Sequence, residues 1–155
     1  DRNAPEGLTD TAQDGYDQSK LLIERWHGQG RNLYAVTPRF APTSSPEQLE
    51  LAGVLYQNTD NVYVQSHVSE NLDEIEWVKD LFPEADSYLD VYRRFGLLGP
   101  RCLYGHGVHF SDAEIEARKK KREAKAERKR LKKEAASAAD SDVGSDELEA
   151  ESEDG

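Results

Sequence analysis

The sequence predicts an α/β fold: part of a β/α barrel of the TIM type, with about three parallel strands and their helices. Three stretches rich in β-branched and aromatic residues predict strands: YAVTPRF (34–40), VYVQSHVSEN (62–71) and CLYGHGVHF (102–110). The strands proper are expected at residues 33–36, 62–65 and 102–104. Helix-type sequence follows each one, and strands that alternate with helices usually run parallel. The 155 residues fall short of the ~250 of a complete barrel, so we expect a central fragment of one.

Helix signals fill the intervals between the strands. A capping-box pattern, in which serine or asparagine precedes glutamine or glutamate by three residues, marks three helix starts. These starts are Ser45–Gln48, Asn71–Glu74 and Ser111–Glu114. An amphipathic helix is also expected over residues 9–26 and a short helix over residues 87–95. The predicted order is therefore α-β-α-β-α-α-β-α.

Charge divides the chain into three segments. Residues 1–115, the predicted barrel region, hold 9 basic and 19 acidic side chains. Residues 116–134 hold 11 basic and 4 acidic side chains but no sustained apolar stripe, which predicts a charged, solvated helix. Residues 135–155 hold 8 acidic side chains and no basic one, and we expect a disordered acidic tail. Neither of these last two segments is expected to pack against the barrel region.

Several classes of protein are excluded or disfavoured by composition. No run of 18 apolar residues occurs, so no membrane-spanning helix is expected. Cys102 is the single cysteine, so no intramolecular disulfide can form. The basic segment lacks interleaved aromatic residues and nucleic-acid-binding signatures, and we expect no nucleic-acid partner. The sequence predicts a cytoplasmic protein.

Each predicted strand leads to a polar side chain that can take part in chemistry. Arg39 follows the first strand, His67 the second and His106 the third. Active sites of β/α barrels lie at the carboxyl ends of the strands. Glu70 follows His67 by three residues, so a metal ligand and a proton shuttle could lie side by side. Each residue also has an ordinary alternative: a structural hydrogen bond for His67, a favourable helix-dipole charge for Glu70, and a salt bridge for Arg39.

Four motifs carry a resemblance to a known family. They are TPRF, QSHVSEN with the DEIEWVKDLFPEA that follows, YLDVYRRFGLLGPR, and GHGVHFSD. These motifs resemble the guanine deaminases, zinc-dependent enzymes of the amidohydrolase superfamily. The resemblance runs from residue 1 to about residue 114 and implies a β/α barrel that hydrolyses guanine to xanthine and ammonia. It also implies a homodimer for the full enzyme.

The resemblance implies a role for each candidate residue. His67 would bind zinc, Glu70 would shuttle protons, His106 would assist at the attacking water, and Arg39 with Phe40 would hold the purine. Zinc sites take four ligands. The family's early His-x-His pair and late aspartate do not occur in this chain, so one of the expected protein ligands is present. We therefore expect this fragment to be inactive alone.

Two other functions remain open. The chain could belong to a related amidohydrolase that acts on another purine or a triazine ring, although the TPRF motif favours guanine. It could also be a catalytically dead fragment that acts as an interaction module through its charged tail. A dead module should tolerate the loss of Glu70, whereas an enzyme should not.

Overall fold

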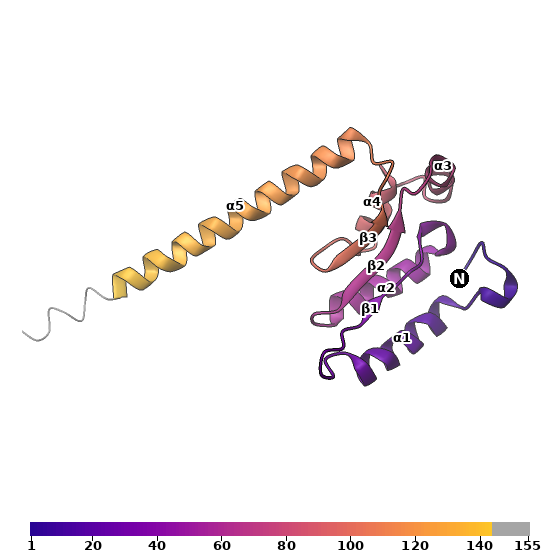
Figure 1. Ribbon diagram of the computed structural model, residues 1–155, viewed down its shortest axis with the longest axis horizontal. Helices are drawn as coiled ribbons and strands as arrows, with labels where there is room; N and C mark the ends of the chain where they lie inside the picture. The colour runs from indigo at the N-terminus through magenta and orange to yellow at the C-terminus, as the bar shows by residue number, and fades with distance from the viewer. Residues whose placement is uncertain (144–155) are drawn as a thin grey trace, which may run out of the picture. The chain divides into compact units, whose positions relative to one another are not determined.

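The computed structural model describes residues 1–143 and divides the chain into two compact units, Asp1–Phe110 and a second unit that begins at Ser111. The first unit is a three-stranded sheet with helices, and the second contains one long helix (Figure 1). The elements of the first unit are η1 (Glu6–Leu8), α1 (Ala12–Trp26), β1 (Ala35–Val36), η2 (Ala41–Thr43), α2 (Pro46–Asn58), β2 (Tyr63–Val68), α3 (Leu72–Leu81), α4 (Tyr88–Arg94) and β3 (Cys102–His106). The second unit contains α5 (Asp112–Val143). The predicted order of helices and strands is confirmed, with two short 3-10 helices added.

The sheet has the strand order β1-β2-β3, and both neighbouring pairs are parallel, as predicted. Figure 1 shows the three strands side by side. Strand β2 continues to Val68 instead of ending at Gln65, because residues 66–68 pair with Tyr104, Gly105 and His106 of β3. The carboxyl ends of β2 and β3 therefore lie next to each other.

The two faces of the sheet are different. Along β2 the side chains of Val64, Ser66 and Val68 are buried, whereas Gln65 is exposed and His67 is half-buried. Successive side chains of a strand point to opposite faces, so one face of β2 belongs to the core and the other is open. Leu103, the partner of Gln65 on β3, is 56% exposed on that open side.

The core lies on the covered face of the sheet. Buried apolar side chains from α2, α3, α4 and the strands form one cluster, and α1 packs against α2. The largest fully buried members are Tyr92, Phe82, Leu49, Leu97, Val62, Val64, Val68, Val78 and Val91. This packing holds the strands in place against α2, α3 and α4.

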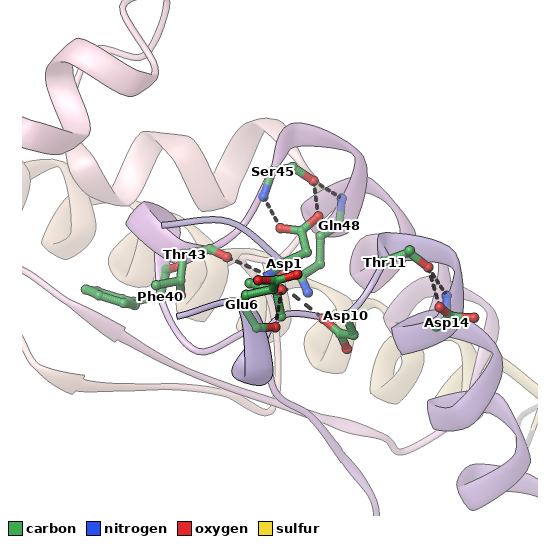
Figure 2. Close-up of polar contacts among 10 residues, drawn as sticks. Asp1, Glu6, Asp10, Thr11, Asp14, Phe40, Thr43, Ser45 and Gln48 are labelled. Atoms are coloured by element: carbon green, nitrogen blue, oxygen red, sulfur yellow. Dashed lines mark hydrogen bonds and ion pairs between the residues drawn. The ribbon is translucent and has the colours of Figure 1, made fainter. Parts of the chain in front are cut away.

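Helix α2 begins differently from the capping box that the sequence predicts. The Ser45 side chain accepts a hydrogen bond from the Gln48 backbone N–H at 3.1 Å, as expected. The reciprocal partner is not Gln48, however, because the Asp1 carboxylate accepts from Ser45 N at 2.7 Å and from Ser45 Oγ at 2.5 Å (Figure 2). The box at Asn71 and Glu74 is confirmed, with both bonds present.

Helix α5 begins at the predicted capping box, in which Glu114 N donates to Ser111 Oγ and Ser111 N donates to the Glu114 carboxylate. It continues to Val143, beyond the boundary at residue 134 that composition predicts. The alanine-rich sequence after that boundary explains the difference, since alanine has the highest helix propensity. The rest of the predicted tail, residues 144–155, lies outside the described residues. Within residues 1–143, no helix is both long and apolar enough to cross a membrane.

Candidate functional site

Three of the predicted site residues meet at the carboxyl end of the sheet. The rings of His67, from β2, and His106, from β3, are stacked with their centroids 5.4 Å apart. Nε2 of His106 lies 3.5 Å from Oε2 of Glu70, which stands between β2 and α3. Both partners are accessible, with 39% of the His106 side chain and 51% of the Glu70 side chain exposed. Two imidazoles and a carboxylate can therefore act together on one small molecule.

His67 is held by the backbone carbonyl of Arg39. That oxygen accepts from the His67 backbone N–H at 3.2 Å and lies 2.7 Å from Nδ1 of the His67 ring. A carbonyl oxygen can only accept, so Nδ1 carries the proton and Nε2 keeps a free lone pair. Metal-bound histidines commonly donate their other ring N–H to a carbonyl in this way. His67 thus fits the metal-ligand role.

A complete metal site is not formed by the chain as described. Within residues 1–143 no group of three or more His, Cys, Asp or Glu side chains is placed to hold a metal ion. His67 can therefore provide one metal ligand, and residues 1–143 do not place the other ligands beside it.

The backbone at His106 explains how its ring reaches His67. In a regular strand, His106 would share the buried face of its partner Val68. Its φ of 65° instead places it in the left-handed region, which breaks the alternation. Gly107 continues the turn with φ 64°, and a Cβ there would lie 2.6 Å from the Phe110 ring. The glycine at 107 is therefore required by its left-handed backbone and by the close approach of Phe110.

The Arg39 backbone lies beside His67, and the Arg39 side chain packs on Phe40. The guanidinium carbon of Arg39 lies 5.4 Å from the centroid of the Phe40 ring, so the two side chains form a cation–π pair. Arg39 is exposed and Phe40 is half-buried. An exposed guanidinium next to an aromatic face offers hydrogen-bond donors and a stacking surface, which together suit a flat, polar heterocycle.

A surface hollow of about 430 Å³ joins two of the predicted residues, Phe40 and Glu70. It is lined by Phe40, Glu70, Asn71, Asp73, Glu74 and Trp77. Glu74 is buried, and its Oε2 accepts from the backbone N–H groups of Glu70 at 3.1 Å and Asn71 at 3.4 Å. The capping box therefore fixes the backbone of Glu70 without using its carboxylate, which faces His106. Arg39, His67 and His106 do not line this hollow.

Sequence reasoning missed two aromatic residues near the site. Trp77 lines the hollow with Phe40 and is 41% exposed. Trp77 follows Glu74 by three residues, and Glu74 follows Asn71 by three. This spacing could have placed Trp77 on the face of α3 that lines the hollow. Tyr92 is fully buried, and its hydroxyl donates to the His67 carbonyl at 2.7 Å. No local signal in the sequence distinguishes it from an ordinary core tyrosine.

Comparison with known proteins places this geometry in a family. The model of the amidohydrolase family matches residues 7–147. The chain is 56% identical over 114 residues to guanine deaminase of Escherichia coli (strain K12), an alignment that covers 74% of this chain and 26% of that protein. It is 41% identical over 118 residues to guanine deaminase of Dictyostelium discoideum, covering 75% and 26%.

Solved structures agree with the sequence comparisons. The E. coli guanine deaminase structure matches with a TM-score of 0.72 over 74% of this chain and 26% of that chain. Guanine deaminase from C. acetobutylicum, solved with guanine bound in its active site, matches with a TM-score of 0.69 at 34% identity, over 77% and 29%. This likeness supports the predicted partial β/α barrel.

All of these matches cover only part of the relatives' length. The chain spans about a quarter of the relatives that it resembles. The family model nevertheless covers nearly all of the chain, and it continues past the predicted boundary at residue 115. The chain therefore belongs to the amidohydrolase family.

Proposed function

We propose that this chain is part of a guanine deaminase, which hydrolyses guanine to xanthine and ammonia. The observation that carries the proposal is the cluster of His67, His106 and Glu70 at the carboxyl ends of neighbouring parallel strands. The 56% identity to the E. coli enzyme supports guanine as the substrate. The relatives' names support the same substrate, and the proposal extends it from them to this chain.

The proposed roles follow from the chemistry of the groups. In hydrolytic deamination, water adds to the ring carbon that carries the amino group, and that group leaves as ammonia. Glu70 takes one proton from the attacking water and passes it to the ring nitrogen, then takes the second from the hydroxyl of the adduct and passes it to the leaving amino group, since its carboxylate is accessible and its backbone is fixed. His106, 3.5 Å from that carboxylate, assists at the attacking water. Arg39 and Phe40 hold the purine by hydrogen bonding and stacking.

His67 is proposed as a zinc ligand through Nε2. When bound, zinc would supply Lewis acidity, which makes water a better nucleophile near neutral pH. The remaining ligands would come from parts of a full-length enzyme that this chain does not contain. We therefore expect purified chain with added Zn²⁺ and guanine to release no appreciable ammonia. The homodimer of a full enzyme and a cytoplasmic location belong to the same proposal.

A chimeric enzyme tests the proposal directly. The 114 residues of the E. coli guanine deaminase that align with this chain are replaced by the residues of this chain. We expect the chimera to convert guanine to xanthine, followed by the change in ultraviolet absorbance. Glu70→Gln in the chimera should lower kcat/KM by about 10²–10⁴-fold, the usual contribution of a general acid–base group.

A matched control uses Glu76, which lies on α3 with a side chain 70% exposed and outside the hollow. Glu76→Gln makes the same chemical change and should leave kcat/KM within about twofold, since exposed surface substitutions have small effects. A folded chimera without guanine deaminase activity would overturn the proposal. Activity that survives Glu70→Gln would remove Glu70 from its role. Activity on another purine or a triazine instead of guanine would favour the related amidohydrolase.

A further inference from the structure

The hydroxyl of Tyr92 bonds to three groups near the site, which belong to two backbone segments. It donates to the His67 carbonyl at 2.7 Å, accepts from the Ala41 N–H at 3.1 Å and accepts from Ser66 Oγ at 2.9 Å. A phenolic hydroxyl has one proton to donate and two lone pairs. All of its hydrogen-bonding capacity is therefore used, in a place where neither Tyr92 nor Ala41 is exposed to solvent.

These bonds connect parts of the site that are distant in sequence. Ala41 directly follows Arg39 and Phe40, whereas Ser66 and His67 belong to β2. The Tyr92 ring also packs on Tyr104 of β3 at 4.8 Å, and β3 ends at His106. Burial raises the pKa of Tyr92 to about 12, so the hydroxyl stays protonated and able to donate near neutral pH.

We propose that Tyr92 is the positioning residue of this site, holding the Arg39 carbonyl and the His67 backbone at the separation that lets the His67 ring donate from Nδ1 to Arg39. This inference rests on the proposed function, because it explains how the candidate metal ligand and the candidate purine-binding pair are set by one group. Tyr92 touches no reacting atom. It acts through the two backbone segments that it joins.

The tautomer of His67 reports this positioning without any need for turnover. The short contact from Nδ1 to the Arg39 carbonyl requires the Nδ1–H tautomer. His27 provides an internal reference of the opposite kind, because its Nδ1 accepts from the Tyr34 N–H at 3.0 Å and its Nε2 lies 2.8 Å from the Asp60 carbonyl. Its neutral ring is therefore expected to be the Nε2–H tautomer.

The experiment uses the full chain labelled with ¹⁵N-histidine, at an alkaline pH where the imidazoles are neutral. Ring ¹⁵N chemical shifts give the tautomer ratio of each histidine, and His67→Gln assigns the His67 signals. Tyr92→Phe keeps the ring and removes the hydroxyl. We expect it to lower the Nδ1–H to Nε2–H ratio of His67 by about fivefold, the factor that the loss of one ordinary hydrogen bond corresponds to, while His27 stays unchanged.

Tyr104→Phe is the matched control. It also removes a mostly covered tyrosine hydroxyl, one that donates to the Leu97 carbonyl at 2.7 Å and makes no bond to the site. It should change neither histidine. Ser66→Ala removes one donor to the Tyr92 hydroxyl and also the contact of Ser66 Oγ with the Arg39 carbonyl at 3.3 Å, so it should change the His67 ratio as well. If Tyr92→Phe fails to fold, an unchanged His67 ratio in Ser66→Ala overturns the inference.

Several outcomes would overturn the inference. An unchanged His67 ratio in Tyr92→Phe, or in Ser66→Ala where Tyr92→Phe does not fold, would show that the hydroxyl does not set the ring. Equal changes in Tyr92→Phe and Tyr104→Phe would show a general structural role. The chimera assay does not depend on the tautomer measurement. An unchanged tautomer ratio therefore leaves the proposed guanine deaminase function standing, and an inactive chimera leaves the tautomer result interpretable.

Discussion

Different kinds of contact stabilise the two units of the chain, each within itself. In the first unit, fully buried side chains from distant segments meet, such as Leu49 of α2, Val64 of β2 and Tyr92 of α4. In α5 the contacts lie between residues three or four positions apart, as in the pairs of Arg130 with Glu127 and Glu134. The first unit therefore depends on burial of apolar surface, which stabilises by about 25 cal/mol per Å². Helix α5 depends on propensity and local pairs worth tenths of a kcal/mol each.

Proteolysis should show the largest difference between the units. Residues 118–133 offer many trypsin sites, and every side chain described in this stretch is exposed, whereas Lys79 lies in α3, which packs into the core. We expect cleavage within 118–133 to be about a hundredfold faster than at Lys79, because local opening costs far less where no core must be disrupted. Time-resolved mass spectrometry of the fragments measures both rates. In 6 M urea the two rates should become similar.

This measurement also tests the expectation that the charged segment does not pack against the barrel region. Protection of residues 118–133 equal to that of Lys79 would mean that the segment belongs to the fold. The expected contrast in protection would then be wrong, and both units would share one stabilising core.

A pair of leucines gives the next largest effect. Leu49 is fully buried, whereas Leu131 of α5 is 53% exposed. Leu49→Ala should destabilise the first unit by about 2–5 kcal/mol, from lost burial and the cavity left behind. Leu131→Ala should change the stability by less than about 0.5 kcal/mol, since it removes little buried surface and alanine favours helix. Urea unfolding followed by the fluorescence of Trp26 and Trp77 reports the stability of the first unit, and helical circular dichroism adds the contribution of α5.

Equal costs for the two substitutions would break the comparison. A large cost for Leu131→Ala would identify a hidden apolar contact of α5. A small cost for Leu49→Ala would mean that the core of the first unit is loosely packed in solution.

Much of the fold was predictable because its signals are local. Capping residues mark the starts of the helices, and Asn71 with Glu74 forms the expected box because both partners lie within one turn. The start of α2 was only half predictable, since the reciprocal partner of Ser45 is Asp1, far away in sequence. The extension of β2 to Val68 likewise depends on pairing with β3 and not on its own residues.

The site divides in the same way. The residue types and their places at strand ends predict a site that contains His67, His106 and Glu70. In the structure the His106 ring stacks on the His67 ring, and its Nε2 lies 3.5 Å from the Glu70 carboxylate. The roles proposed for them stay predictions. The left-handed backbone at His106 and the bonds of the Tyr92 hydroxyl could not be predicted, because each depends on tertiary neighbours that a single sequence does not reveal.

The smallest expected effect comes from ion pairs. Its dependence on salt should differ between the two units. Arg130 lies 2.8 Å from Glu127, and Lys79 pairs with Glu76 in α3 at the same three-residue spacing, with all four side chains more than half exposed. Arg130→Gln should weaken α5 by about 0.2–0.5 kcal/mol, since local pairs are a large share of what holds that helix. Lys79→Gln removes one such pair, whereas Arg130→Gln removes the pairs with both Glu127 and Glu134, and α3 is also held by the core. Its helical content should therefore not change measurably.

Amide hydrogen exchange around each pair, at low salt and in 1 M NaCl, measures both effects. Exposed pairs are screened when the Debye length falls to about 3 Å, so the effect of Arg130→Gln should disappear at high salt. An effect that persists in 1 M NaCl would mean that Arg130 acts through packing of its aliphatic stem and not through charge. Equal loss of protection around Lys79 and Arg130 would mean that local pairs matter as much in the packed unit as in the solvated helix. The contrast between a unit held by its core and a helix held by its neighbours would then fail at its most sensitive point.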